Sequence, residues 1–126
     1  KRHTPLYKVL IVDDDPVCCA ILGRMLAETG PEVRTATTGD EAITIATPYD
    51  PDLLICDWLL KSPHSGLDVA RILHRMQPDM QIIFITGLST DELREKAVDL
   101  PVIDIFSKPL DLDLVLGTVN EAIAGR

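Results

Sequence analysis

The chain has 126 residues, 46% of them hydrophobic, and its 12 basic and 20 acidic residues give a net charge of -8. This length suits one domain with a single core, which we expect to span residues 1–126, and the apolar content excludes a disordered chain. The negative charge argues against direct contact with nucleic acid or an anionic membrane surface. No apolar run reaches the roughly 20 residues that cross a bilayer, so a cytoplasmic location is expected.

Short apolar runs alternate five times with amphipathic stretches, and no internal linker interrupts them. Runs of this length predict β-strands, and the amphipathic stretches between them predict helices. The alternation is typical of a parallel sheet with helices on both faces. The sequence therefore predicts a doubly wound α/β fold with strands at 9–12, 33–36, 53–56, 82–85 and 102–106.

Capping residues mark where the helices begin. Asp15 is a candidate N-cap before Pro16, whose fixed φ suits a first helical position, and Gly30 is expected to stop that helix. Capping-box spacings predict the next three starts, at Thr38 with Glu41, Ser65 with Asp68, and Ser89 with Glu92. The last helix follows Asp111 or Asp113 and carries an apolar stripe, so we expect it to pack against the sheet edge.

Polar side chains follow the predicted strands where four of them end. Asp13 and Asp14 follow the first run, Asp57 the third, Thr86 the fourth and Lys108 the fifth. Since the carboxyl ends of parallel strands meet at one rim, where ligands bind in such sheets, these five side chains are expected to lie together.

Three carboxylates at one rim repel each other unless a cation lies between them. Mg²⁺ suits such a set because it prefers oxygen ligands and binds through one or two carboxylates with phosphate oxygens. A carboxylate can also attack phosphorus to form an acyl phosphate, and Lys108 could neutralise charge on the transferring group. The pattern thus points to phosphoryl transfer, with one of these carboxylates as the acceptor.

Each of these residues also has a plain structural interpretation. The acids of 13–15 could serve only to cap the first helix, and Asp57 could be a turn residue. Thr86 with Gly87 is an ordinary strand exit, and Lys108 before Pro109 could simply end a strand. Their joint placement at successive strand ends favours the functional interpretation, because chance would scatter them over both rims.

The motifs together resemble a response-regulator receiver domain of two-component signal transduction, the family typified by the bacterial chemotaxis regulator. The matching stretches are Val-Leu-Ile-Val-Asp-Asp-Asp-Pro at 9–16, Leu-Ile-Cys-Asp at 54–57, Ile-Thr-Gly at 85–87 and Ser-Lys-Pro at 107–109. The resemblance implies a three-layer, flavodoxin-like (βα)5 fold with a five-stranded parallel sheet in the order 2-1-3-4-5.

The resemblance also implies a Mg²⁺ or Mn²⁺ site. Asp13 and Asp14 would form its acidic pocket, Asp14 as the more direct ligand. Asp57 and the backbone carbonyl of Leu59 would complete the share of the metal shell that the protein supplies.

Phosphoryl chemistry at Asp57 follows from the same resemblance. The donor would be a phosphohistidine on a sensor histidine kinase or phosphotransfer protein. Thr86 would bind a phosphoryl oxygen, and Lys108, with a cis peptide to Pro109, would pair with it. Modification would switch the conformation and control a partner or an attached output domain. A homodimer through the fourth helix, fifth strand and fifth helix is a further expectation. The domain would be no enzyme beyond catalysing its own phosphorylation and dephosphorylation.

Several positions depart from the family pattern. Ile105 stands where a switch Tyr or Phe is usual, three residues before the lysine. The loop over 58–66 is one residue longer than the common one, and its His64 could meet a partner. Leu59 and Leu88, two residues beyond the acceptor and beyond Thr86, are apolar, which predicts reduced access of water.

Two alternatives from other functional classes stay open. A pseudo-receiver would keep the fold as an interaction module without phosphotransfer, and the altered loop and Ile105 favour it. A phosphatase resembling the haloacid dehalogenase family would also use a strand-end Asp with Mg²⁺. That family needs a second Asp two residues after the first, where this chain has Leu59.

Overall fold

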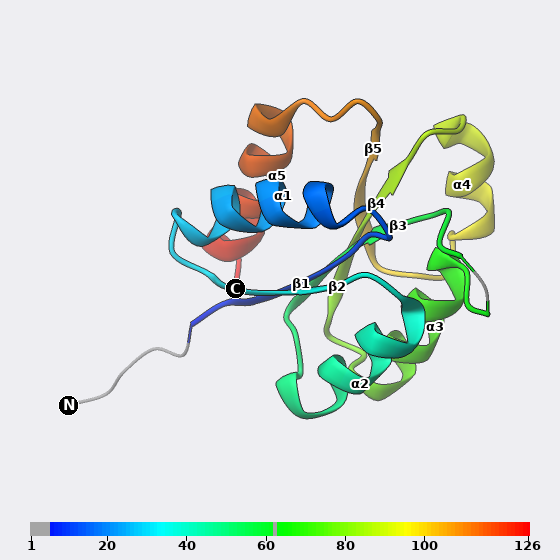
Figure 1. Ribbon diagram of the computed structural model, residues 1–126, viewed down its shortest axis with the longest axis horizontal. Helices are drawn as coiled ribbons and strands as arrows, with labels where there is room; N and C mark the ends of the chain where they lie inside the picture. The colour runs from blue at the N-terminus through cyan, green and yellow to red at the C-terminus, as the bar shows by residue number, and fades with distance from the viewer. Residues whose placement is uncertain (1–5, 62) are drawn as a thin grey trace.

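The computed structural model describes residues 6–61 and 63–126, which form five strands and five helices in strict alternation (Figure 1). The strands are β1 (Lys8–Val12), β2 (Glu32–Ala36), β3 (Leu53–Asp57), β4 (Gln81–Thr86) and β5 (Val102–Ser107). The helices are α1 (Pro16–Ala27), α2 (Gly39–Tyr49), α3 (Gly66–Met76), α4 (Thr90–Lys96) and α5 (Leu112–Ala124). All five predicted strands are present, each end within one residue of the expected bound.

The strands form one parallel sheet in the order β2-β1-β3-β4-β5, as the resemblance implied. Helices α1 and α5 cover one face, and α2, α3 and α4 cover the other (Figure 1). The predicted three-layer, doubly wound α/β fold is therefore confirmed. Among the described residues, no helix is long and apolar enough to cross a membrane.

Alternating side chains of the strands fill two cores, one on each face of the sheet. In β1, Val9 and Ile11 pack with α1 and α5, whereas Leu10 and Val12 pack with α2 and α3. This division follows from the two-residue period of a strand. Because both faces are covered, β1 and β3 read as continuous apolar runs, which is why the sequence revealed them.

Most of the predicted helix caps are present. The side chains of Asp15, Thr38, Ser65 and Asp111 each accept a hydrogen bond from a backbone amide in the first turn, and Ser65 with Asp68 forms a complete capping box. The capping box expected at Ser89 is wrong, because its side chain makes no such bond. Ser89 is exposed, so water can hydrate the first amides of α4 instead.

Helix α5 also differs from expectation, because it packs on a face of the sheet and not at the edge. Its buried Val115 and Val119 belong to the same core cluster as the β-strand residues Ile83 and Ile85. The three cysteines are free thiols.

The last strand contains an irregularity that sets the direction of its side chains. Ile82 pairs with Val102 but Ile83 pairs with Asp104, so Ile103 is an extra residue. The Asp104 carboxylate accepts a hydrogen bond from the amide of Ile105 at 2.8 Å. As a result Ile105 is buried on the α4 side of the sheet.

Candidate functional site

The carboxyl ends of the strands gather the predicted side chains at one rim. Asp13 follows β1, Asp57 and Thr86 are the last residues of β3 and β4, and Lys108 follows β5. All three of Asp13, Asp57 and Thr86 are buried, at 0%, 4% and 0% exposure. Buried polar side chains of this kind are costly unless they are paired, so their clustering needs a chemical explanation.

Lys108 is the cation that joins this cluster. Its Nζ lies 3.1 Å from Oδ2 of Asp57 and 3.1 Å from Oδ2 of Asp13. Burial acts to lower the pKa of Lys108, but the two carboxylates outweigh it and raise the pKa above its usual range. The amine therefore stays protonated and supplies a fixed positive charge beside Asp57.

The two oxygens of Asp57 have different partners. Oδ2 accepts a hydrogen bond from Lys108, and Oδ1 accepts one from the amide of Leu59 at 3.0 Å. Burial raises the pKa of Asp57, although the bonds from Leu59 and Lys108 act in the opposite direction. The carboxylate is thus held in one orientation at the rim and only weakly solvated.

The acidic cluster fits a divalent cation. Asp13, Asp14 and Asp57 each offer an oxygen, and these oxygens all lie within 4.8 Å of one another. Oδ2 of Asp13 is buried and makes no hydrogen bond, although the Lys108 amine is 3.1 Å away. One ammonium group leaves such a set of three carboxylates with excess negative charge, and oxygen donors are what Mg²⁺ prefers.

Thr86 is connected to Lys108 through the backbone. The carbonyl oxygen of Thr86 accepts a hydrogen bond from the Lys108 amide at 2.7 Å, and the Lys108–Pro109 peptide is cis, as expected. The Thr86 hydroxyl accepts a bond from the amide of Leu88 at 2.8 Å. Its proton is free to be donated elsewhere, since the hydroxyl acts here as an acceptor.

Gly66 also belongs to the site, and sequence reasoning did not single it out. Its amide donates to the carbonyl of Trp58 at 3.0 Å. A Cβ at this position would overlap the carbonyl oxygen of Asp57 and lie 2.8 Å from Cα of Trp58. The first turn of α3 therefore rests directly on the backbone of Asp57. A lone glycine after a capping serine gives no sequence signal of such a contact.

The residues that depart from the family pattern occupy distinct surroundings. Ile105 is buried at 7% exposure, whereas the side chains of Leu59 and Leu88 are about half exposed, at 52% and 49%. Trp58 packs edge-on against Phe84, with ring centroids 5.0 Å apart. The expected longer loop includes residue 62, which lies outside the described residues.

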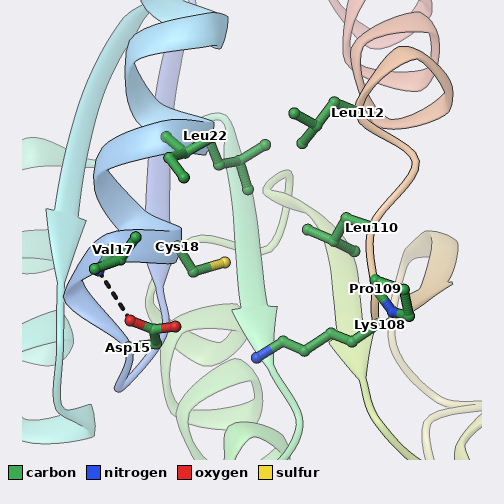
Figure 2. A pocket seen from close by; sticks show the side chains of 9 residues that line it. Asp15, Val17, Cys18, Leu22, Lys108, Pro109, Leu110 and Leu112 are labelled. Carbon is green, nitrogen blue, oxygen red and sulfur yellow. Dashed lines mark hydrogen bonds between the residues drawn. The ribbon is translucent and has the colours of Figure 1, made fainter.

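An apolar hollow of about 330 Å³ lies beside the site, between α1 and the segment that leads into α5. Its apolar lining includes Val17, Ile21, Leu110 and Leu112. Figure 2 shows Lys108 extending along one end of it from the end of β5 toward α1. The hollow thus opens next to the charged cluster.

Comparison with known proteins gives a family for this arrangement. Residues 9–120 match the family described as the response regulator receiver domain. The nitrogen assimilation regulatory protein NtrX of Azorhizobium caulinodans is 28% identical over 118 residues, 93% of this chain and 26% of that protein. The transcriptional regulatory protein GlrR of Escherichia coli K12 is 29% identical over 121 residues, 96% of this chain and 27% of that protein. The chain thus spans about a quarter of the length of these relatives.

Solved structures agree with the fold. A CheY-like receiver domain protein of Methanospirillum hungatei has a TM-score of 0.88 at 24% identity and covers 96% of both chains. A receiver domain protein of Clostridium thermocellum has a TM-score of 0.84 at 26% identity, covering 94% of this chain and 95% of that one. With its motifs, its strand order and its family match in agreement, the chain belongs to the receiver domains of two-component response regulators, which are signalling domains.

Proposed function

We propose that the domain accepts a phosphoryl group on Asp57 from a phosphohistidine, in a reaction that depends on Mg²⁺ or Mn²⁺. The observation that carries the proposal is the buried Asp57 carboxylate, paired with Lys108 at 3.1 Å and grouped with Asp13 and Asp14. This arrangement is costly to fold. A structural role explains the capping by Asp15 and the bond from the Asp15 amide to Asp13, but not the grouping of Asp13, Asp14 and Asp57.

In the proposed step, one Asp57 oxygen attacks phosphorus and the bond from phosphorus to the imidazole nitrogen breaks. The electron pair of the broken bond stays on the imidazole nitrogen of the donor. The Leu59 amide and Lys108 hold the carboxylate for this attack. Lys108 neutralises part of the charge on the phosphoryl oxygens, and the Thr86 hydroxyl turns to donate to one of them.

Asp13, Asp14, Asp57 and the carbonyl of Leu59 would hold the divalent cation. The cation would supply charge neutralisation for the phosphoryl oxygens and relieve the repulsion among the carboxylates. The added charge at Asp57 would then shift Thr86 and the loops near it to a second conformation, which a partner or an attached output domain would read.

The partners of this reaction would be a sensor histidine kinase or a phosphotransfer protein of the cytoplasm. The hollow beside Lys108 supports this proposal, because an apolar surface next to the acceptor offers a donor protein a place to dock. A homodimer through α4, β5 and α5 is a further part of the proposal.

Acetyl phosphate, a small phosphoryl donor, provides the test. The protein should gain the mass of one phosphoryl group with Mg²⁺ or Mn²⁺ present, and should gain none in EDTA. Fluorescence of Trp58, the sole tryptophan, should change as Mg²⁺ is added, because its backbone adjoins Asp57. A silent titration together with an unchanged mass would favour a pseudo-receiver.

A phosphatase of the haloacid dehalogenase type has less support. The second acid that such an enzyme needs two residues after the nucleophile is replaced by Leu59, which has no group for proton transfer. No steady turnover of a phosphomonoester is therefore expected.

A further inference from the structure

His64 lies in the acceptor connection, the segment 58–65 that joins β3 to α3 and whose residue 62 is outside the described residues. Its Nε2 is 3.2 Å from Oδ1 of Asp40, in the first turn of α2. The His64 side chain is only 30% exposed, so it rests against the protein. An imidazole Nε2–H can donate to a carboxylate whether the ring is neutral or protonated.

A second contact seats the same side chain on α2. A Cβ at Gly39 would lie 2.8 Å from Cβ of His64 and 2.9 Å from Cγ2 of Val69. Any side chain at position 39 would therefore push His64 away or disturb the core near α3. The glycine leaves the space that His64 fills, so packing and polar contact act on different atoms of one residue.

The β3 end of the acceptor connection is tied to Asp57 and to the first residue of α3. The Leu59 amide donates to Asp57, and the Gly66 amide donates to the carbonyl of Trp58. His64 adds a contact with a different helix, α2, which begins just after β2. The carbonyl of Ala36, the last residue of β2, accepts a hydrogen bond from the Asp13 amide. His64, near the α3 end of the connection, is thus braced against the helix that follows the strand next to the acidic cluster.

We propose that His64 is a positioning residue that, through its contacts with Gly39 and Asp40, holds the α3 end of the acceptor connection in place. It would thereby favour the position in which the Leu59 carbonyl would bind a divalent cation. This inference rests on the proposed function, because it assigns His64 a role toward the same metal site. His64 itself does not touch the reacting atoms.

Two readouts test the role, one of them without metal. The first is the hydrogen-exchange rate of the Leu59 and Gly66 amides in metal-free protein, measured by NMR. The second is the dissociation constant for Mg²⁺, measured by Trp58 fluorescence. In His64→Ala we expect both amides to exchange about threefold to fivefold faster. We expect the dissociation constant for Mg²⁺ to rise about threefold to fivefold. Both changes match the free energy that an exposed ion pair contributes.

Matched variants separate positioning from a general loss of structure. His64→Gln keeps an N–H donor near the position of Nε2 and should restore both readouts. Asp40→Ala should reproduce His64→Ala, and the double variant should be no worse than either single one. Asp113→Ala removes the corresponding first-turn acid of α5 and should leave both readouts at the wild-type value.

The outcomes also distinguish this inference from the proposed function. If wild-type protein binds Mg²⁺ but His64→Ala matches it in both readouts, the positioning role is wrong and the proposed function stands. Failure of His64→Gln to restore either readout also overturns the role. If wild-type protein neither binds Mg²⁺ nor is phosphorylated, the proposed function fails and this inference fails with it.

Discussion

Burial of the Asp57 carboxylate disfavours its charged form, so ionised Asp57 reduces the stability of the metal-free domain. Burial raises the pKa of Asp57 in the folded protein, although the Leu59 amide and Lys108 counteract part of the effect. The unfolded chain then loses this proton at lower pH than the folded one. The favourable contribution of Asp57 to the free energy of unfolding is therefore full below about pH 3.9, the usual Asp pKa. It is lost as pH rises through the pKa of Asp57 in the folded protein.

Asp57→Asn should therefore stabilise the protein in EDTA at pH 7, by on the order of 1 kcal/mol in the free energy of unfolding. The gain should shrink toward zero near pH 3, since both side chains are then neutral. Urea denaturation over a pH series measures it, with the exposed Asp91→Asn as control. A variant less stable than wild type at pH 7 would show that attraction to Lys108 outweighs burial.

Single residues also explain where sequence reasoning succeeded and where it stopped. The positions of Asp13 and Asp57 could be predicted because each directly follows an apolar run, and Lys108 comes two residues after another. Parallel strands bring such positions to one rim. The role of Gly66 could not, because its contact with the Asp57 backbone depends on how α3 enters. The pairing of His64 with Asp40 likewise joins residues 24 positions apart and leaves no pattern.

At the scale of elements, the start of α3 packs against the backbone of Asp57, and a substitution at Gly66 tests that contact. Gly66→Ala places a Cβ against the carbonyl of Asp57, and backbone cannot shift as a side chain does. We expect a loss of about 2–4 kcal/mol in the free energy of unfolding and slower phosphorylation. Chemical denaturation and intact mass after acetyl phosphate treatment measure the two effects.

Gly117 provides the matched control, since it lies inside α5 and a Cβ there would meet nothing within 4 Å. Gly117→Ala should raise stability by about 0.5–1 kcal/mol, because alanine favours a helix. Equal stability changes in the two variants would contradict the close contact at Gly66.

Helix α4 is attached more firmly at its end than at its start. Arg71 of α3 donates to both carboxylate oxygens of Asp99, at 3.0 and 3.1 Å, and to the carbonyl of Lys96 at 2.9 Å. The Ser89 side chain, at the start of α4, makes no capping bond. We therefore expect the start of α4, which lies near Thr86 where the proposed signal begins, to move more readily than its end.

Arg71→Ala should accelerate amide hydrogen exchange at the end of α4, around Ala97 and Leu100, by up to about fivefold, as loss of an exposed ion pair allows. Phosphorylation of Asp57 should be unchanged, because Arg71 lies outside the site. Hydrogen exchange with mass detection checks both ends of α4. Arg75→Ala, one turn further along α3 and exposed, is the control and should show no effect. Exchange that rises equally at the start of α4 would contradict one-sided attachment.

Across the whole molecule, the sequence predicted the layers and strand order better than the details that direct side chains. Periodicity and caps locate helices, since they are local, and the strand order followed from the motifs of the family. The extra residue in β5 depends on pairing between Ile83 and Asp104, so it was invisible before the sheet was known. It turns Ile105 toward α4, at the position where a switch aromatic is usual in the family.

The central claim is that Asp57 accepts the phosphoryl group. Wild type, Asp57→Asn and the control Asp91→Asn should be incubated with acetyl phosphate and Mg²⁺, and their intact masses compared. The account predicts one added phosphoryl group on wild type and on Asp91→Asn, and none on Asp57→Asn. Addition of a phosphoryl group to Asp57→Asn would contradict the assignment of the acceptor.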